Sequence, residues 1–301
     1  MIKLIKISLL IISVVYFSAC DYVSSPYKQQ PGVVTSTDTS KVYKNILVED
    51  YTGITCGNCP GAADVLDSMI KKYGSRIVPM AVNAGSFATP PLAPSQYNID
   101  FTSPTGDAYN TFFGISSNPN GMVNRKGYPQ TNVQTDGNWD AIAYGIIQND
   151  TAFIKLTLST TFDTTSRNLS VTATSKFLKT YPPSTPSTKF NLVVLLTQDS
   201  IIAPQLKYGA PNNQIVNYAH RYALRDAINS TWGDTLVSNG ATLNQTVVKT
   251  YNNYNIKATY GTATNSHGPI PCNFKQCYVV AYVYNGTTYE VLQSMQKKIY
   301  P

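Results

Sequence analysis

Two cysteines separated by two residues constrain this chain most, because they lie where an apolar segment meets a helical pattern. Cys56 and Cys59 follow the apolar run Ile46-Leu47-Val48, and apolar residues then recur every three to four positions as far as Tyr73. A cysteine at a helix N-terminus faces unpaired backbone N–H groups that favour its thiolate, and a second cysteine three residues later can close a disulfide. The sequence therefore predicts a strand that leads into a helix with paired thiols at its start.

Two further residues fit this arrangement. Asp50 lies six positions before Cys56, and strand alternation places its side chain on the same face as Val48, buried beneath the thiols. Burial there would raise the pKa of Asp50, so that it accepts a proton near neutral pH. Pro119 resembles the cis-proline that faces the disulfide of thioredoxin-like domains and leaves the preceding backbone free to pair with an extended substrate. The pattern as a whole resembles a thioredoxin-like domain over residues 42–150.

The apolar periodicity changes near residue 150. Strands and helices alternate before it, as in an α/β domain, whereas apolar and polar residues alternate after it, as in two packed antiparallel sheets. We expect an α/β thioredoxin-like domain at 42–150 and an all-β, immunoglobulin-like sandwich with one helix at 151–301. The expected elements are strands at 42–51, 77–82 and 122–125, helices at 56–73, 107–113, 139–147 and 215–228, a start or bulge at Pro79, and a final hairpin turning at Asn285-Gly286.

The first twenty residues have the features of an export signal. Lys3 and Lys6 precede an apolar stretch, and Ser18-Ala19 then precede Cys20. Because a cysteine follows the small residues, we predict that Cys20 is acylated and becomes the first residue of a mature lipoprotein. The alternative is an ordinary signal peptide with a coincidental cysteine. Residues 21–41 lack apolar periodicity, so a flexible tether is expected there.

The five cysteines divide into one predicted lipid site and two local pairs. Without Cys20, the pairs are Cys56 with Cys59 and Cys272 with Cys277. An exported chain meets an oxidising compartment, so both pairs are expected to form disulfides, and Cys272–Cys277 is interpreted as a loop staple. Zinc held between the two pairs is the less favoured alternative.

The role of the first pair stays open between two hypotheses. In an exchange reaction Cys56 would attack a disulfide and Cys59 would resolve the mixed intermediate. The buried Asp50 would accept the proton, and Pro119 would help to hold the substrate. In the other hypothesis the disulfide is permanently closed. Thr55 replaces the aromatic residue usual before the first cysteine, and Pro60 replaces a common basic residue, so both departures disfavour exchange.

Other chemistry is not indicated by the sequence. His220 and His267 are the only histidines, and neither has metal-ligand or triad spacing to a partner. The basic residues that give the net charge of +7 are scattered along the sequence, so they form no basic stripe of the kind that binds nucleic acid. We expect no cofactor, no metal, no nucleic-acid partner and no small-molecule substrate. The 22 tyrosines suit either a glycan or peptide groove or plain strand propensity, and propensity is favoured.

The remaining charged residues are interpreted as surface groups. Glu49 points away from Asp50 on an alternating strand and is expected at the solvent or between domains. Arg221, Arg225 and Asp226 have helical spacing and are expected on a solvated or salt-bridged helix face.

Residues 45–60, Asn-Ile-Leu-Val-Glu-Asp-Tyr-Thr-Gly-Ile-Thr-Cys-Gly-Asn-Cys-Pro, resemble the opening motif of the outer-membrane protein 28 family of Bacteroidetes lipoproteins. Residues 118–125, 218–226 and 279–286 are further matches. The resemblance implies a thioredoxin-like domain followed by a β-rich one, anchored at the outer membrane by the N-terminal lipid, with the membrane face left open. We therefore expect a binding or accessory module with a protein partner in that membrane. A thiol-disulfide oxidoreductase of the envelope is the alternative, and adhesion to host or matrix proteins is a third possibility.

Overall fold

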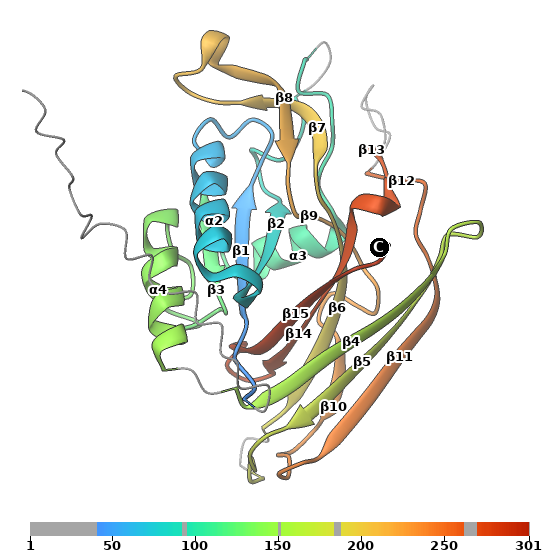
Figure 1. The fold of residues 1–301 in the computed structure, drawn as a ribbon. Helices are drawn as coiled ribbons and strands as arrows, with labels where there is room; N and C mark the ends of the chain where they lie inside the picture. Colours follow the sequence, from blue (N-terminus) through green and yellow to red (C-terminus); the bar gives the residue numbers. More distant parts are fainter. Residues whose placement is uncertain (1–40, 92–94, 150–151, 184–187, 262–269, 301) are drawn as a thin grey trace, which may run out of the picture. The chain divides into compact units, whose positions relative to one another are not determined.

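A strand and a helix flank the paired cysteines. In the computed structural model (Figure 1), β1 (Ile46–Thr52) leads through the cysteine loop into α2 (Cys59–Tyr73). The described residues are 41–91, 95–149, 152–183, 188–261 and 270–300. The predicted export signal, Cys20 and His267 lie outside them, as does the predicted tether up to residue 40. β1 is buried along its length because apolar side chains cover both of its faces.

The neighbours of β1 run in both directions. β2 (Ile77–Asn83) pairs with it in parallel, whereas β3 (Asn120–Val123) pairs with it in antiparallel orientation. The helices α2 and α4 (Asp136–Gln148) cover one face of these strands, and α3 (Pro104–Phe112) contributes to the apolar cluster on the other. These elements confirm the strands and helices predicted before residue 150, with ends shifted by a few residues.

The position of Pro79 differs from its prediction. It lies third in the seven-residue β2 and pairs in register with Val48, rather than at a strand start or bulge. A proline lacks the N–H that a sheet neighbour would accept. The neighbour on the far side of β2 pairs only at Ala81, so no ladder bond is lost at Pro79.

The sheet continues beyond residue 150 without interruption. Among the described residues its order is β15-β14-β6-β9-β2-β1-β3, and β10 pairs with β6. The sheet thus crosses the predicted boundary between the two domains, and β9 makes the junction.

The strands of the second half are β4 (Ile154–Asp163), β5 (Asn168–Phe177), β6 (Phe190–Gln198), β7 (Ile201–Leu206), β8 (Gln214–His220), β9 (Ala223–Ala227), β10 (Asp234–Val237), β11 (Thr246–Asn255), β12 (Thr259–Tyr260), β13 (Ile270–Pro271), β14 (Cys277–Asn285) and β15 (Val291–Lys298). Short 3-10 turns lie at Gly74–Arg76, Pro211–Asn213 and Phe274–Gln276.

A second sheet, in the order β11-β5-β4, packs against the β6 and β14 part of the first. In β5 every second residue is buried, so one face of this sheet is apolar, as the alternation predicted. Phe177 and Phe190 meet edge to face across the shared core, with ring centroids 5.3 Å apart. The described part of the chain is therefore mainly β with few helices, and two of its sheets lie face to face.

The helix predicted at 215–228 is wrong. The segment forms β8, which pairs with β7, and β9, which lies between β2 and β6. Tyr222 separates the two strands with a left-handed backbone (φ 54°). The three-to-four spacing of its apolar residues arises from two short strands with a break between them, and pairing with distant strands overrides the local pattern.

The final hairpin is confirmed, but its turn is longer than predicted. β14 and β15 pair in antiparallel orientation. The backbone N–H of Asn285 donates to Glu290 O, so the loop closes across five residues rather than at a two-residue Asn-Gly turn. The side-chain oxygen of Asn285 accepts from Thr287 N and Thr288 N, which stabilises this wider turn.

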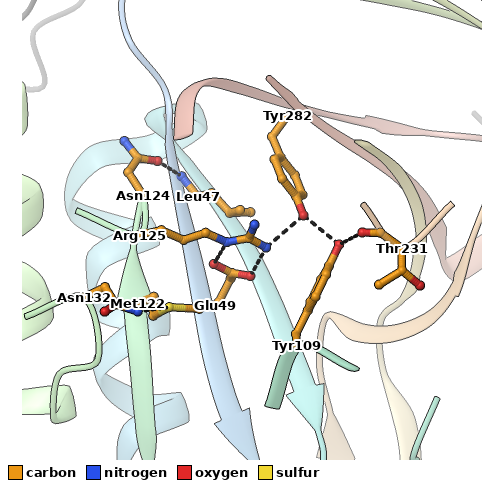
Figure 2. A network of polar contacts seen from close by, with 9 residues as sticks. All are labelled: Leu47, Glu49, Tyr109, Met122, Asn124, Arg125, Asn132, Thr231 and Tyr282. Atoms are coloured by element: carbon orange, nitrogen blue, oxygen red, sulfur yellow. Dashed lines mark hydrogen bonds and ion pairs between the residues drawn. The ribbon is translucent and has the colours of Figure 1, made fainter. Parts of the chain in front are cut away.

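A buried ion pair connects the sheet to α3 (Figure 2). Arg125, just after β3, donates from Nε and Nη2 to the Glu49 carboxylate at 2.8 and 2.7 Å, and both side chains are fully buried. Nη2 also donates to the Tyr282 hydroxyl, which is hydrogen-bonded to the hydroxyl of Tyr109 on α3. The prediction of a solvent or interdomain Glu49 is therefore wrong, because Arg125 neutralises its carboxylate inside the core. Four aromatic rings surround the guanidinium: Tyr109, Phe113, Tyr282 and Tyr284.

Removal of either charge of this pair should destabilise the protein strongly. We expect Arg125→Met or Glu49→Leu alone to lower the free energy of unfolding in urea by about 3–5 kcal/mol, because the other charge stays buried and unpaired. The double variant should lose much less than the sum of the two single losses. Lys72→Met, which breaks the half-exposed pair with Asp140, is the control and should cost about 1 kcal/mol or less. Strictly additive losses would contradict this account.

Candidate functional site

Cys56 and Cys59 form a disulfide between the end of β1 and the first turn of α2. The loop is held locally, because Cys56 N donates to Gly53 O and Cys59 N donates to Cys56 O. Both cysteines are only 2% exposed. The backbone and the hydroxyl of Thr55 both donate to Phe87 O, so the loop after β2 holds the cysteine loop from one side.

The β7–β8 hairpin covers the same loop from the other side. The side-chain amide of Gln205, itself 2% exposed, donates to Gly53 O at 3.1 Å and to Cys56 O at 3.0 Å. Tyr208 N donates to Gly57 O, and its ring lies so close that a Cβ added to Gly57 would be 2.6 Å from it. The hairpin thus occupies three backbone carbonyls of the cysteine loop and packs closely against Gly57.

A cavity of about 240 Å³ lies beside Cys59, beneath the same hairpin. Three buried polar atoms of its lining residues have no hydrogen-bond partner among the described residues: Asp50 Oδ1, Asn83 Oδ1 and His220 Nε2. Unpaired buried polar atoms are costly, and a cavity of this size has room for water that would satisfy them. The ring of His220, at the end of β8, packs against the ring of Phe101, with the ring centroids 4.3 Å apart.

The carboxyl of Asp50 is buried, as predicted. Burial raises its pKa from the ordinary value of 3.8 to about 7, and the charge of Asp136 adds to the shift. Burial also lowers the pKa of His220 to about 4, so the imidazole beside the same cavity is neutral at physiological pH. A carboxyl that titrates near neutral pH, next to Cys59, can accept or hold a proton during thiol chemistry.

Pro119 is preceded by a cis peptide bond, as predicted, and lies just before β3. The structure brings it close to the strand that carries Asp50, because Gly121 of β3 pairs in register with Asp50 of β1. The side chain of Asn118 donates to Ala84 O at the end of β2. The chain segments predicted for the site therefore converge at the ends of the β1 and β2 strands.

The second cysteine pair is close but unbonded in the structure. The sulfurs of Cys272 and Cys277 lie 3.5 Å apart, and both residues are buried. The hydrogen bond between the thiols lowers the pKa of Cys272 and raises that of Cys277. The two residues therefore come together as the sequence analysis expected, and the loop staple stays a prediction.

The sequence analysis missed two residues of the site, Gln205 and Tyr208. Nothing in the spacing around them indicates that this distant hairpin covers the disulfide. Gly57 is the one local signal, because the contact with the Tyr208 ring leaves no space for a side chain.

Over the described ranges, no group of three or more histidine, cysteine or acidic residues is arranged to hold a metal. None of the helices in those ranges is both long and apolar enough to span a membrane.

Comparison with known proteins gives one family match. The model of the family "Outer membrane protein Omp28" matches residues 106–301, a range that begins after the paired cysteines. Among solved structures, HBP35 of Porphyromonas gingivalis is similar at 18% identity, covering 86% of this chain and 76% of its own, with a TM-score of 0.58. A domain of the outer membrane lipoprotein Omp28 from Porphyromonas gingivalis is similar at 21% identity, covering 50% of this chain and 90% of its own, with a TM-score of 0.30. No curated protein matches.

The raised pKa of Asp50 should make stability depend on pH. Below pH 4 the carboxyl is protonated in both states; between about pH 4 and 7 it ionises only in the unfolded chain, so the free energy of unfolding falls as pH rises. The total fall should be on the order of 4 kcal/mol, at about 1.4 kcal/mol per pH unit. Asp50→Asn should remove this slope, as measured by urea unfolding from pH 4 to 8. The exposed Asp64→Asn is the control, and an unchanged slope in Asp50→Asn would contradict the assignment.

Proposed function

Because this chain belongs to the Omp28 family of outer membrane proteins, we propose that it acts in the outer membrane of the cell envelope as a binding or accessory module. In this proposal the Cys56–Cys59 disulfide is permanently closed and braces the strand–helix junction. The observation that carries it is the seal over the disulfide: both cysteines are 2% exposed, and Gln205 and Tyr208 occupy the backbone of the cysteine loop. Burial of both cysteines restricts the approach of a partner's thiolate to either sulfur.

A thioredoxin-like assignment for residues 42–150 is part of the proposal. It is supported by the parallel pair β1 and β2, the antiparallel β3 after a cis-proline, and the disulfide at the start of α2. The immunoglobulin-like sandwich proposed for residues 151–301 is supported by the two sheets packed face to face. The protein partner in the outer membrane is proposed from the family alone.

Opening the seal should expose the disulfide. We expect Gln205→Ala and Tyr208→Ala each to speed its reduction by dithiothreitol in the folded protein by about tenfold, because each removes hydrogen bonds or contacts that hold the hairpin down. Alkylation of the released thiols followed by mass spectrometry measures the rate. Tyr144→Ala, at an exposed tyrosine on α4, is the matched control. A wild-type disulfide that is reduced as fast in the folded protein as in urea would contradict the closed role.

A second candidate function is thiol-disulfide exchange in the envelope. The observation that favours it is the cavity beside Cys59, where the unpaired oxygen of Asp50 and a carboxyl pKa of about 7 provide a proton acceptor. In this reaction a thiol reductant of the envelope would first reduce the Cys56–Cys59 disulfide, and the Cys56 thiolate would then attack a substrate disulfide and release one substrate thiolate. Cys59 would then attack Cys56, which restores the protein disulfide and releases the second substrate thiolate. Mixed disulfides captured in cells by Cys59→Ser would support this function, and an empty trap alongside a positive control would leave the closed role.

We also propose that Cys20 is acylated and holds the protein at the membrane. Its place after Ser18-Ala19, at the end of an apolar stretch, supports this. Cys20→Ala should move the protein from the membrane fraction into the soluble fraction, as measured by fractionation and immunoblotting. The intact protein should carry the mass of the lipid on its N-terminal peptide. A wild-type peptide without added mass would overturn the anchor.

A further inference from the structure

One arginine is buried without a hydrogen-bond partner in the described part of the chain. Arg225, on β9, is 3% exposed, and its Nε, Nη1 and Nη2 atoms have no hydrogen-bond partner among the described residues. The other four arginines all donate hydrogen bonds: Arg76, Arg125, Arg167 and Arg221. Arg225 is therefore an exception within its own fold.

The contrast with Arg125 indicates what is missing. Arg125 is equally buried, and there the fold supplies the carboxylate of Glu49 in a two-point contact. A guanidinium keeps its proton in proteins, so Arg225 cannot escape the cost of burial by becoming neutral. Among the described residues no hydrogen-bond acceptor meets the five N–H groups of this buried cation, so an anion from outside the chain would satisfy them.

The cavity next to Arg225 has room for such an anion. Its volume is about 420 Å³, and both Arg225 and Tyr260 line it. The guanidinium carbon lies 5.3 Å from the centre of the Tyr260 ring. Thr102, before the start of α3, and Lys257 line the same cavity, and the Thr102 hydroxyl donates to Asp100 Oδ1.

Two carboxylates in the lining limit what can bind. Asp226 is already occupied, because it accepts from the Tyr254 hydroxyl at 2.7 Å and lies 3.6 Å from the Lys257 ammonium. Asp107 is exposed and also lines the cavity. Both repel an anion that carries more than one charge, so they favour a singly charged group over phosphate.

We propose that this cavity binds the carboxylate group of a small organic acid, with Arg225 as its two-point hydrogen-bond partner. The planar fork of a guanidinium matches the two oxygens of a carboxylate. The volume lies within the range of small-molecule sites. No cysteine lines this cavity, so the inference is independent of the role of the Cys56–Cys59 disulfide.

The test is a titration of the full-length, ¹⁵N-labelled protein with sodium acetate at constant ionic strength. We expect saturable shifts of the Arg225 Nε–H signal and of the Thr259 amide, and about tenfold or more weaker binding at Thr259 in Arg225→Met. Without acetate, Arg225→Met should raise the melting temperature, because it replaces an unpaired buried charge by an apolar side chain. Arg221→Met, which removes a paired and exposed guanidinium, should leave the acetate response unchanged.

Three outcomes would overturn the proposal. Absence of saturable shifts at Arg225 and Thr259 would show that the cavity binds no carboxylate. Saturation by inorganic phosphate but not by acetate would replace the carboxylate with a different anion. A lower melting temperature of Arg225→Met without acetate would show that Arg225 already has a stabilising partner within the protein.

Discussion

The ion pair between Glu49 and Arg125 determines how the rest of this structure is arranged. It places a carboxylate from β1 and a guanidinium from the end of β3 in the middle of the core, where neither could stay alone. The guanidinium then requires aromatic faces and a hydroxyl around it, which α3 and β14 supply through Tyr109 and Tyr282. Segments more than 150 residues apart are thereby held together (Figure 2). The cysteine loop follows β1, the strand that carries Glu49.

Local patterns predicted the elements that form from local contacts. The strand and helix around the cysteines, the buried Asp50 and the cis-proline at Pro119 follow from periodicity and motif spacing, and the structure has all of them. The segment 215–228 failed because its strand character comes from partners far away in the chain. The same limit hid the pairing of Glu49, since the distance from position 49 to 125 carries no periodic signal.

The two candidate sites differ in what closes them. At the disulfide, the protein's own β7–β8 hairpin donates hydrogen bonds to the carbonyls of the cysteine loop, through Gln205 and Tyr208. At Arg225 the part of the chain that the structure describes supplies a buried charge without a hydrogen-bond partner. The Gly53 and Cys56 carbonyls of the cysteine loop have hydrogen-bond partners without a ligand, whereas the guanidinium of Arg225 has none among the described residues, which is why we assign a structural role to the first site and binding to the second.

The junction between β2 and β9 has a mechanical consequence. These strands share a single register pair, Ala81 with Ala223, together with the hydrogen bond from Ala81 N to Tyr222 O. Elsewhere, as between β6 and β14, the backbone ladder runs the whole length of the strand. A force that pulls the large sheet apart should therefore separate β2 from β9 first. Side-chain packing, rather than backbone hydrogen bonds, resists the separation of these two strands.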